Sequence, residues 1–196
     1  MVTSVAYSSI LYTVILSVSY WSWIAIEIWL IARERGDANA VYQDRGTRKV
    51  LITSWFIAIV LGIFTLPHLL PQFTIHSKVV AIGIVLVWAG IAFRLWAIKT
   101  LGSFFNTRVA VREQQQLITS GPYYYLRNPS YTGTVMTFLG FGIAIGNWIS
   151  LIALLMFGII PYIRRIAVED VALAARFGRE YEEYRRKTWS MIPFLW

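Results

Sequence analysis

The chain lacks cysteine altogether and has only two histidines among its 196 residues. Without cysteine there can be no disulfide, no thiol nucleophile and no cysteine-ligated metal, although this absence does not fix the compartment. Charged residues are scarce as well, at 14% of the chain, whereas 57% of the residues are hydrophobic and 16% are aromatic. A composition this apolar excludes an ordinary soluble domain and predicts an integral membrane protein.

Internal repeats, low-complexity runs and glycine-rich phosphate loops are also missing, so the sequence predicts a single domain over residues 1–196. Within it, residues 1–98 hold three apolar spans, and residues 99–196 hold a long loop, a helical hairpin and C-terminal helices. The net charge is +8, but the basic residues are dispersed through loops and form no basic helix. This argues against nucleic-acid binding and favours contact with anionic membrane lipids.

Five apolar segments predict an all-α membrane protein with about five transmembrane helices. The segments are Val5–Ala32, Val50–Leu70, Val79–Ile98, Tyr131–Gly146 and Trp148–Ile163. The first three reach the roughly 20 residues needed to cross a bilayer core. The last two are shorter, which is compatible with full or partial spanning. The Gly146-Asn147 break between them predicts the tight turn of a helical hairpin.

Basic residues predict the orientation of these segments. If all five cross, the stretches 33–49, 94–127 and 164–196 lie on one side and hold 17 of the 18 lysines and arginines. Only Lys78 lies opposite. The positive-inside rule then places the C-terminus and the C-terminal helices in the cytoplasm and the N-terminus outside. The first segment is expected to be a span rather than a cleaved signal, since it lacks a positive n-region and its apolar run is too long.

The stretch from Leu101 to Tyr131, between the third and fourth spans, is longer than a structureless loop normally is, which favours a functional role. At its end Asn128 and Pro129 predict the start of a helix, with an asparagine N-cap and proline at the first position. The unpaired N–H groups and the positive dipole end of such a helix suit a carboxylate or a phosphate. Most capped helices nevertheless bind no ligand.

Past the fifth span, a helix is predicted to continue through Arg165 and Glu169 until Gly178 ends it. Arg165 and Glu169 are four residues apart and share a face. An intrahelical ion pair is one interpretation, and a separate outside partner for each is the other, because arginine before glutamate is the weaker order. Arginine can bind a carboxylate with two parallel bonds, and glutamate can bind an ammonium group. The following REYEEYRRK stretch predicts an amphipathic surface helix.

Several motifs occur in a fixed order: LGSFF, QLITSGPY, RNPSYTG, an arginine followed by an acidic pair, FGREYEEY and a closing Ile192-Pro193. Together they resemble the isoprenylcysteine carboxyl methyltransferase family over roughly the second half of the chain. The resemblance implies a helical membrane enzyme that uses S-adenosyl-L-methionine. It also implies methyl transfer to the carboxylate of a membrane-borne isoprenoid or lipid-like acceptor of the prenylcysteine type, either a lipophilic small molecule or a prenylated substrate.

Carried over position by position, the resemblance implies a cofactor pocket and a substrate-binding arginine. The implied cofactor-binding residues are Gln115, Gln116, Leu117, Ile118, Tyr123, Asn128, Pro129, Ser130, Tyr131, Glu169 and Asp170. Arg165 would meet the acceptor carboxylate, and Arg165 and Glu169 would form the catalytic pair. The family's usual Arg-His-Pro is Arg127-Asn128-Pro129 here. Asparagine keeps a hydrogen-bond donor but cannot carry a charge. Which residue offsets the negative charge of the cofactor carboxylate therefore stays open.

The chemistry itself favours a carboxylate acceptor. A carboxyl group has a pKa of about 4 and is already ionised near neutrality, so no general base is needed. Both histidines, His68 and His76, fall on the non-cytoplasmic side of the predicted topology, which leaves the candidate site without one. An amine or thiol acceptor must lose a proton, although a glutamate or tyrosine could accept it. The two histidines are not expected to form a metal site.

Other functions remain open at this point. A phospholipid or amine N-methyltransferase with the same cofactor is the nearest alternative. An NADPH-dependent membrane lipid or sterol reductase is disfavoured by the short chain and the missing dinucleotide fingerprint. A non-catalytic scaffold ranks last, because it needs no enclosed polar pocket. The short, undecorated chain suggests a prokaryotic source, in which a small isoprenoid or lipid carboxylate fits the acceptor as well as prenylcysteine does.

Overall fold

The computed structural model describes residues 2–33, 40–42, 44–65, 77–107, 110–112 and 115–194. Its α-helices are α1 (Val2–Arg33), α2 (Thr47–Ile59), α4 (Ser77–Leu101), α5 (Pro129–Ile145), α6 (Trp148–Phe177) and α7 (Arg179–Lys187). The shorter turns are η1 (Val60–Thr65), which continues α2, and η2 (Gly102–Phe104) and η3 (Gly121–Tyr124), which flank the α4–α5 connection. The strands are β1 (Ala40–Tyr42) and β2 (Ala110–Arg112).

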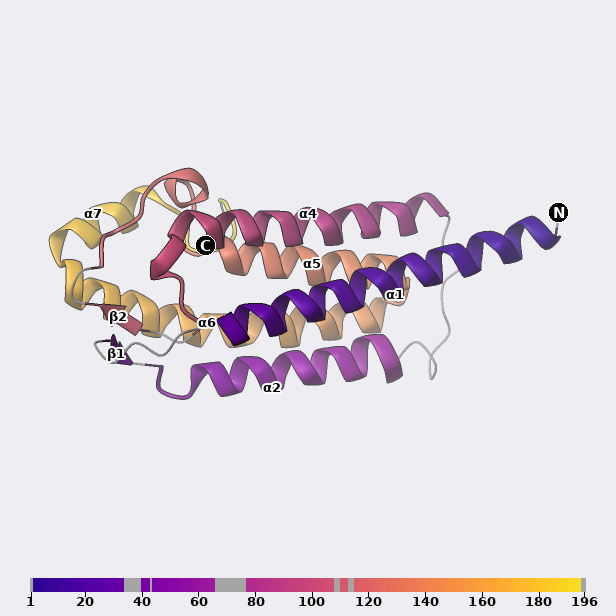
Figure 1. The fold of residues 1–196 in the computed structure, drawn as a ribbon, viewed down its shortest axis with the longest axis horizontal. Helices are drawn as coiled ribbons and strands as arrows, with labels where there is room; N and C mark the ends of the chain where they lie inside the picture. Colours follow the sequence, from indigo (N-terminus) through magenta and orange to yellow (C-terminus); the bar gives the residue numbers. More distant parts are fainter. Residues whose placement is uncertain are drawn as a thin grey trace.

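Helices α1, α2, α4, α5 and α6 form an elongated bundle in which each runs roughly antiparallel to the one before it (Figure 1). Helices α1, α4 and α6 run toward one end of the bundle, and α2 and α5 run away from it. The strands and α7 gather at that same end, to the left in Figure 1. The α1–α2 connection, the α4–α5 connection and the C-terminal segment therefore meet there, as the distribution of basic residues predicts.

Among the described residues, three helical stretches are long and apolar enough to cross a membrane: Ile10–Arg33, Ser77–Phe104 and Trp148–Phe177. Helix α2 and its continuation η1 have 13 and 6 residues, and α5 has 17. The sequence predicts that the fourth and fifth apolar segments are shorter than the first three. In the structure the fifth segment is part of the 30-residue α6, because the helix runs on through Arg164 and Arg165 without a break.

The bundle confirms the helical class, but the sequence did not predict the small β-ribbon. Strands β1 and β2 pair antiparallel, with Ala40 opposite Arg112 and Tyr42 opposite Ala110. Each strand has only three residues, which is too few positions for an alternating pattern to identify it. The ribbon ties the α1–α2 connection to the α4–α5 connection.

Helices α4 and α5 approach each other through glycines. A Cβ atom on Gly133 would lie 2.7 Å from the backbone nitrogen of Arg94, and one on Gly140 would lie 2.6 Å from that of Val87. These distances exclude any side chain, so the two backbones can pack as closely as small residues permit in membrane helices. The contact places Arg94 of α4 against the first turns of α5.

Aromatic side chains fill the middle of the bundle. Trp23 of α1 contacts Phe138 of α5 edge to face, with ring centroids 5.4 Å apart, and Trp55 of α2 lies 5.8 Å from Trp23. Val87 and Leu154 complete this core from α4 and α6, and neither is exposed. A second buried group, which includes Leu51 and Tyr162, lies nearer the end that carries the ribbon.

Helix ends differ in how they are capped. The predicted hairpin turn is confirmed: Gly146 ends α5 with φ 73°, and Asn147 caps α6 by accepting hydrogen bonds from the N–H groups of Ile149 and Ser150 at 3.0 Å. Asn128 does precede α5, but the predicted side-chain cap is wrong. Its amide instead donates to the carbonyl of Ser190 at 3.2 Å, because the C-terminal segment lies beside it.

Candidate functional site

A cavity lies among α1, α2, α4, α5, α6, α7 and the α4–α5 connection. Part of its lining is apolar and comes from α1, α2, α4 and η2: Ile31, Leu51, Ile52, Trp55, Leu101 and Phe104. Another part is polar and comes from the 115–131 segment, α5 and α6. A cavity with both kinds of wall suits a ligand with a charged group and a hydrocarbon part.

Most of the predicted site residues line this cavity. They are Gln115, Gln116, Leu117, Ile118, Tyr123, Asn128, Ser130, Tyr131, Arg165 and Glu169. Pro129 and Asp170 are not part of the lining. Pro129 is buried in the first turn of α5. Asp170 follows Glu169 by one position and so points about 100° away from it around the helix, toward α7.

Arg165 is buried, with 2% of its side chain exposed, and all three guanidinium nitrogens are bonded. Nε donates to the hydroxyl of Tyr131 at 2.7 Å and lies 3.3 Å from the carboxylate of Glu169. Nη1 donates to Asp44 at 3.3 Å, and Nη2 donates to the carbonyl of Thr107 at 2.8 Å. The intrahelical pair therefore forms, and Tyr131, Asp44 and Thr107 add contacts from outside α6. That Arg165 and Glu169 each bind a ligand group stays a prediction.

Tyr131 connects the start of α5 to the middle of α6. Its hydroxyl accepts from Arg165 and donates to Glu169. Its ring stacks on that of Tyr162, with centroids 4.3 Å apart and planes 28° apart. The tyrosine thereby fixes the orientation of both members of the Arg165–Glu169 pair.

Sequence reasoning missed a second buried ion pair on the cavity wall. Arg94 of α4 and Glu27 of α1 face each other through two contacts, Nε to Oε1 at 2.7 Å and Nη2 to Oε2 at 2.9 Å. Arg94 also donates to the carbonyl of Ser130 at 3.1 Å. The sequence did contain a signal for this pair, because Glu27 and Arg94 each lie inside an apolar segment. Placing an ionisable side chain there costs free energy and marks a candidate functional site.

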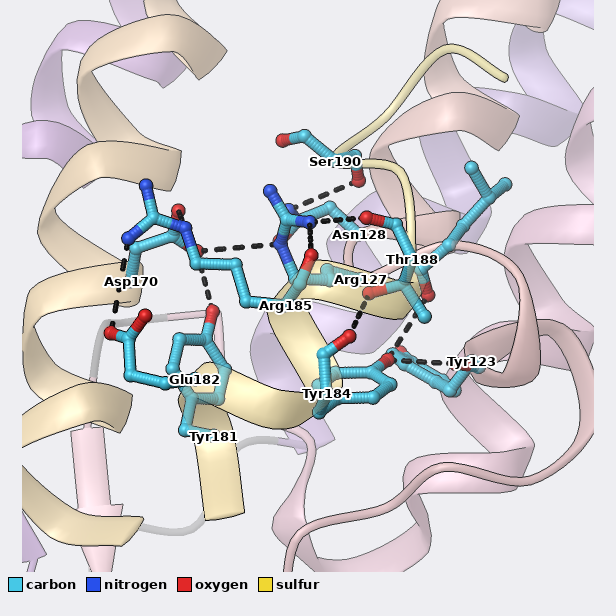
Figure 2. A network of polar contacts seen from close by, with 11 residues as sticks. Tyr123, Arg127, Asn128, Asp170, Tyr181, Glu182, Tyr184, Arg185, Thr188 and Ser190 are labelled. Carbon is cyan, nitrogen blue, oxygen red and sulfur yellow. Dashed lines mark hydrogen bonds and ion pairs between the residues drawn. The ribbon is translucent and has the colours of Figure 1, made fainter. Parts of the chain in front are cut away.

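The C-terminal segment holds the Arg127-Asn128 motif in place (Figure 2). The backbone N–H groups of Arg127 and Asn128 donate to the carbonyls of Trp189 and Ser190 at 2.8 and 2.9 Å. The guanidinium of Arg127 donates to the carbonyl of Thr188 at 2.6 Å. The residues before α5 are therefore fixed by a segment about 60 positions away, which no local pattern could indicate.

Asp170 joins α6 to α7 and to Arg127. It accepts a hydrogen bond from Tyr181 at 2.5 Å and lies 3.9 Å from Arg127 and from Arg185 (Figure 2). Burial raises the pKa of Tyr181, and the adjacent Asp170 carboxylate raises that pKa further. Tyr181 therefore stays protonated as a donor. The contacts of Asp170 hold elements together around the cavity, and Tyr181 itself lines it.

Comparisons with known proteins give the family. The family model described as phospholipid methyltransferase matches residues 79–180, which is just over half of the chain. A probable protein-S-isoprenylcysteine O-methyltransferase of Oryza sativa subsp. indica is 32% identical over 161 residues, covering 76% of this chain and 84% of the rice protein. The chain belongs to the isoprenylcysteine carboxyl methyltransferase family. The expected membership in a family of membrane methyltransferases is confirmed.

Further relatives of this methyltransferase family agree. Protein-S-isoprenylcysteine O-methyltransferase of Schizosaccharomyces pombe is 35% identical over 104 residues, covering 50% of this chain and 43% of that protein. The solved structure of the eukaryotic intramembrane Ras methyltransferase matches with a TM-score of 0.58 at 27% identity, covering 79% of this chain. This chain spans 54% of that one. The relatives named are eukaryotic, so the prokaryotic source suggested by the short chain gains no support.

Proposed function

We propose that the protein is an S-adenosyl-L-methionine-dependent carboxyl methyltransferase. Its acceptor would be a membrane-borne isoprenoid or lipid-like carboxylate of the prenylcysteine type. The observation that carries this proposal is the buried Arg165–Glu169 pair on the wall of a cavity that also has an apolar lining. The names of the relatives support the prenylcysteine type of acceptor.

Glu169 is the group on the cavity wall that fits a cationic part of the cofactor. Asp44 and Glu169 place two carboxylates against the single guanidinium of Arg165, so Arg165 cannot neutralise both. A carboxylate of this kind can bind an ammonium group through a charge-assisted hydrogen bond. The wall as a whole carries more arginine than glutamate, namely Arg48, Arg94, Arg127 and Arg165 against Glu27 and Glu169. The indole N–H of Trp55 is buried and has no hydrogen-bond partner among the described residues, so a donor on the wall is available to a ligand.

The cofactor would be held by the wall residues of the 115–118 segment, Tyr123, Asn128, Ser130, Tyr131 and Glu169. When bound, it would supply the methyl group on a sulfonium centre. Glu169, fixed by Tyr131, would bind the ammonium group through a charge-assisted hydrogen bond. Pro129 and Asp170 would act through neighbours, Pro129 by starting α5 and Asp170 by holding α7 and Arg127.

The residues of the chain would supply orientation and exclude water. The acceptor carboxylate is ionised near neutrality, so no proton has to be removed. Arg165 would orient that carboxylate, and the contacts with Tyr131 and Thr107 limit the positions its guanidinium can take. Aligning two reactants in a closed site makes their reaction resemble an intramolecular one, which lowers the activation barrier by about several kcal/mol relative to free reactants in water. His68 and His76 lie outside the described residues, so their predicted location stays a prediction.

An amine N-methyltransferase is the second candidate. The matching family model is described as phospholipid methyltransferase, and this match supports an amine headgroup as acceptor. Glu169 would then have to accept a proton, as well as bind the cofactor. The prenylcysteine type is preferred because Arg165 is a cation on the cavity wall and would repel a protonated amine.

We further propose five crossings, with the N-terminus outside and the C-terminal helices and the site in the cytoplasm. The three candidate spans support this proposal together with α2–η1 and α5, which run between them in alternating direction (Figure 1). The basic residues of the ribbon end support the orientation. Membrane lipids would surround the bundle, whose outer face carries exposed side chains such as Ile82, Val85 and Ile152.

Two binding experiments test the cofactor and the class of reaction. Purified protein in detergent is titrated with S-adenosylhomocysteine or with NADPH, and its thermal unfolding midpoint is followed. A ligand that binds only the folded state raises the midpoint in a saturable way. We expect a rise with S-adenosylhomocysteine and none with NADPH. A rise with NADPH alone would replace the methyltransferase proposal with the reductase alternative.

A further inference from the structure

The outer edge of the Arg165 guanidinium is covered by two connections between helices. Nη1 is bonded to Asp44, which lies between β1 and α2, and Nη2 is bonded to the carbonyl of Thr107, which lies between η2 and β2. The β1–β2 ribbon ties the same two connections together. The two Nη atoms form the edge that a carboxylate binds with parallel hydrogen bonds. Each Nη atom carries two N–H groups, and one on each already has a partner here. An acceptor carboxylate that binds this edge therefore competes with these partners.

The charges indicate which partner leaves. Arg165 already faces two carboxylates, so a third would add like-charge repulsion. Glu169 is on the same helix as Arg165 and is also held by Tyr131. Thr107 offers a neutral carbonyl. Among the described residues that contact Arg165, Asp44 is the charged partner on a connecting segment, and replacing it with an acceptor carboxylate leaves the total charge unchanged.

We propose that Asp44 competes with the acceptor for Arg165. Without an acceptor, the Asp44 carboxylate pairs with the buried guanidinium, which would otherwise be costly to leave unpaired. When an acceptor binds, its carboxylate takes the place of Asp44 on Nη1, and Asp44 moves toward solvent. This inference rests on the proposed function, because it requires a carboxylate acceptor.

Asp44 keeps other hydrogen bonds after such an exchange. Oδ1 also accepts from the hydroxyl of Thr47 at 2.9 Å, and Oδ2 accepts from the N–H of Arg48 at 3.0 Å. Asp44 thus caps the start of α2, and its side chain is 18% exposed, against 2% for Arg165. A purely structural anchor is the competing explanation. The two explanations differ in what loss of the charge does to acceptor binding.

Two variants separate the charge of Asp44 from its capping role. Asp44→Asn removes the charge and keeps one oxygen that can accept a hydrogen bond from the first turn of α2, whereas Asp44→Ala removes the charge and both acceptor oxygens. Glu183→Gln is the matched control, because Glu183 is at the same end of the bundle in an exposed pair with Arg179. Each variant is assayed for binding of a prenylcysteine carboxylate and its carboxamide, and for KM and kcat of methyl transfer to the carboxylate.

A competitor reduces the fraction of protein that is competent to bind the acceptor, so removing it raises the apparent affinity. We expect both Asp44 variants to bind the carboxylate about 3- to 10-fold more tightly, with a similar fall in KM and a smaller change in kcat. Carboxamide binding should stay within about twofold, and Glu183→Gln should match the wild type. Unchanged or weaker carboxylate binding in Asp44→Asn would overturn the competition, and an effect limited to Asp44→Ala would assign Asp44 to capping alone.

The wild-type protein distinguishes this inference from the proposed function. If it neither binds nor methylates a prenylcysteine carboxylate, the proposed function fails and the competition fails with it. If it methylates the carboxylate but the Asp44 variants keep its KM, only the competition is wrong.

Discussion

Among single residues, Arg165 is the one on which the proposed chemistry depends most. A buried guanidinium is tolerated only when its charge is paired and its donors are bonded, and every nitrogen of Arg165 has a partner. Three of these partners come from other parts of the chain, namely Asp44, Thr107 and Tyr131. The orientation of the guanidinium is thus set by the fold, which is what a group that aligns a reactant requires.

Arg165→Lys keeps the charge but replaces a planar fork with a single ammonium. We expect methyl transfer to a prenylcysteine carboxylate to fall by about 100-fold or more, since misplacement of a reactant by about 1 Å has that effect. Affinity for S-adenosyl-L-methionine should stay within about threefold. Radiolabelled methyl transfer and cofactor binding measure the two quantities. Arg164→Lys, at the exposed neighbouring position, is the control and should keep near wild-type activity. Full activity in Arg165→Lys would contradict the role given to Arg165.

Glu169→Gln tests the cofactor side of the same pair. Glutamine can still accept from Tyr131, so the variant removes the charge with little change in shape. We expect S-adenosyl-L-methionine to bind more weakly by about 1 to 3 kcal/mol, the strength of a charge-assisted hydrogen bond. This corresponds to roughly 5- to 150-fold in the dissociation constant. Isothermal titration of the folded variant checks it, with the exposed Glu180→Gln as control. Equal affinity in both variants would leave Glu169 with a structural role only.

Residue-level reasoning could find the Arg165–Glu169 pair because a spacing of four places two side chains on one helix face. It could not find Asp44, which is 121 positions from Arg165 in the sequence. The Glu27–Arg94 pair likewise joins α1 to α4 across the bundle. The cavity wall that these residues complete depends on how distant segments meet, and no local spacing contains that information.

At the scale of elements, helix starts are less uniform than their sequences suggest. Asn128 and Asn147 both precede a helix, and the sequence predicts a cap at the first. The structure has the side-chain cap at the second, where Asn147 is buried and accepts two N–H groups. The amide of Asn128 is bonded to the C-terminal segment instead. Proline at the first position fixes where α5 begins, but what the preceding asparagine binds is decided by tertiary contacts.

Asn147→Ala and Asn128→Ala compare these two helix starts directly. Loss of a side-chain cap costs about 1 kcal/mol, which corresponds to roughly 2 to 4 °C for a chain of this size. We expect Asn147→Ala to lower the thermal unfolding midpoint by about that amount. Asn128→Ala should lower the midpoint less. It should also weaken the attachment of the C-terminal segment, which would be measured as faster proteolysis after Lys187. A larger loss of stability in Asn128→Ala would contradict this assignment of caps.

Element positions were largely predictable, because apolar runs of about 20 residues leave few alternatives to membrane helices. Helices α1, α4, α5 and α6 begin and end within a few residues of the predicted segments, except where α6 continues past Ile163. The β-ribbon was not predictable. Its strands are short, and their pairing depends on two connections that come together only after the bundle has formed.

At the scale of the whole molecule, the fold separates an apolar bundle from a polar end. The cavity and both buried ion pairs involve elements that reach this end, and α7 covers it (Figure 1). Most basic residues of the described segments gather there too, and under the proposed orientation this end faces the cytoplasm. The chemistry would therefore take place close to one membrane surface.

Membrane orientation can be tested with fusions to the two chain ends. A reporter placed after Trp196 should be cytoplasmic, and one placed before Met1 should be external, because the five bundle helices alternate in direction and the basic residues lie at one end. Protease protection in sealed vesicles measures both positions. If both reporters lie on the same side, the number of crossings is even, and α2 or α5 does not span.

Methyl transfer from S-adenosyl-L-methionine to a carboxylate can be tested by the stability of the product. The most direct measurement supplies purified protein with the radiolabelled cofactor and with a prenylcysteine and an aminophospholipid in separate reactions, and then treats each product with alkali. A methyl ester releases volatile labelled methanol, whereas an N-methyl group is stable to alkali. We expect alkali-labile label on the prenylcysteine and none on the aminophospholipid. Alkali-stable label confined to the aminophospholipid would contradict this expectation and would establish amine methylation instead.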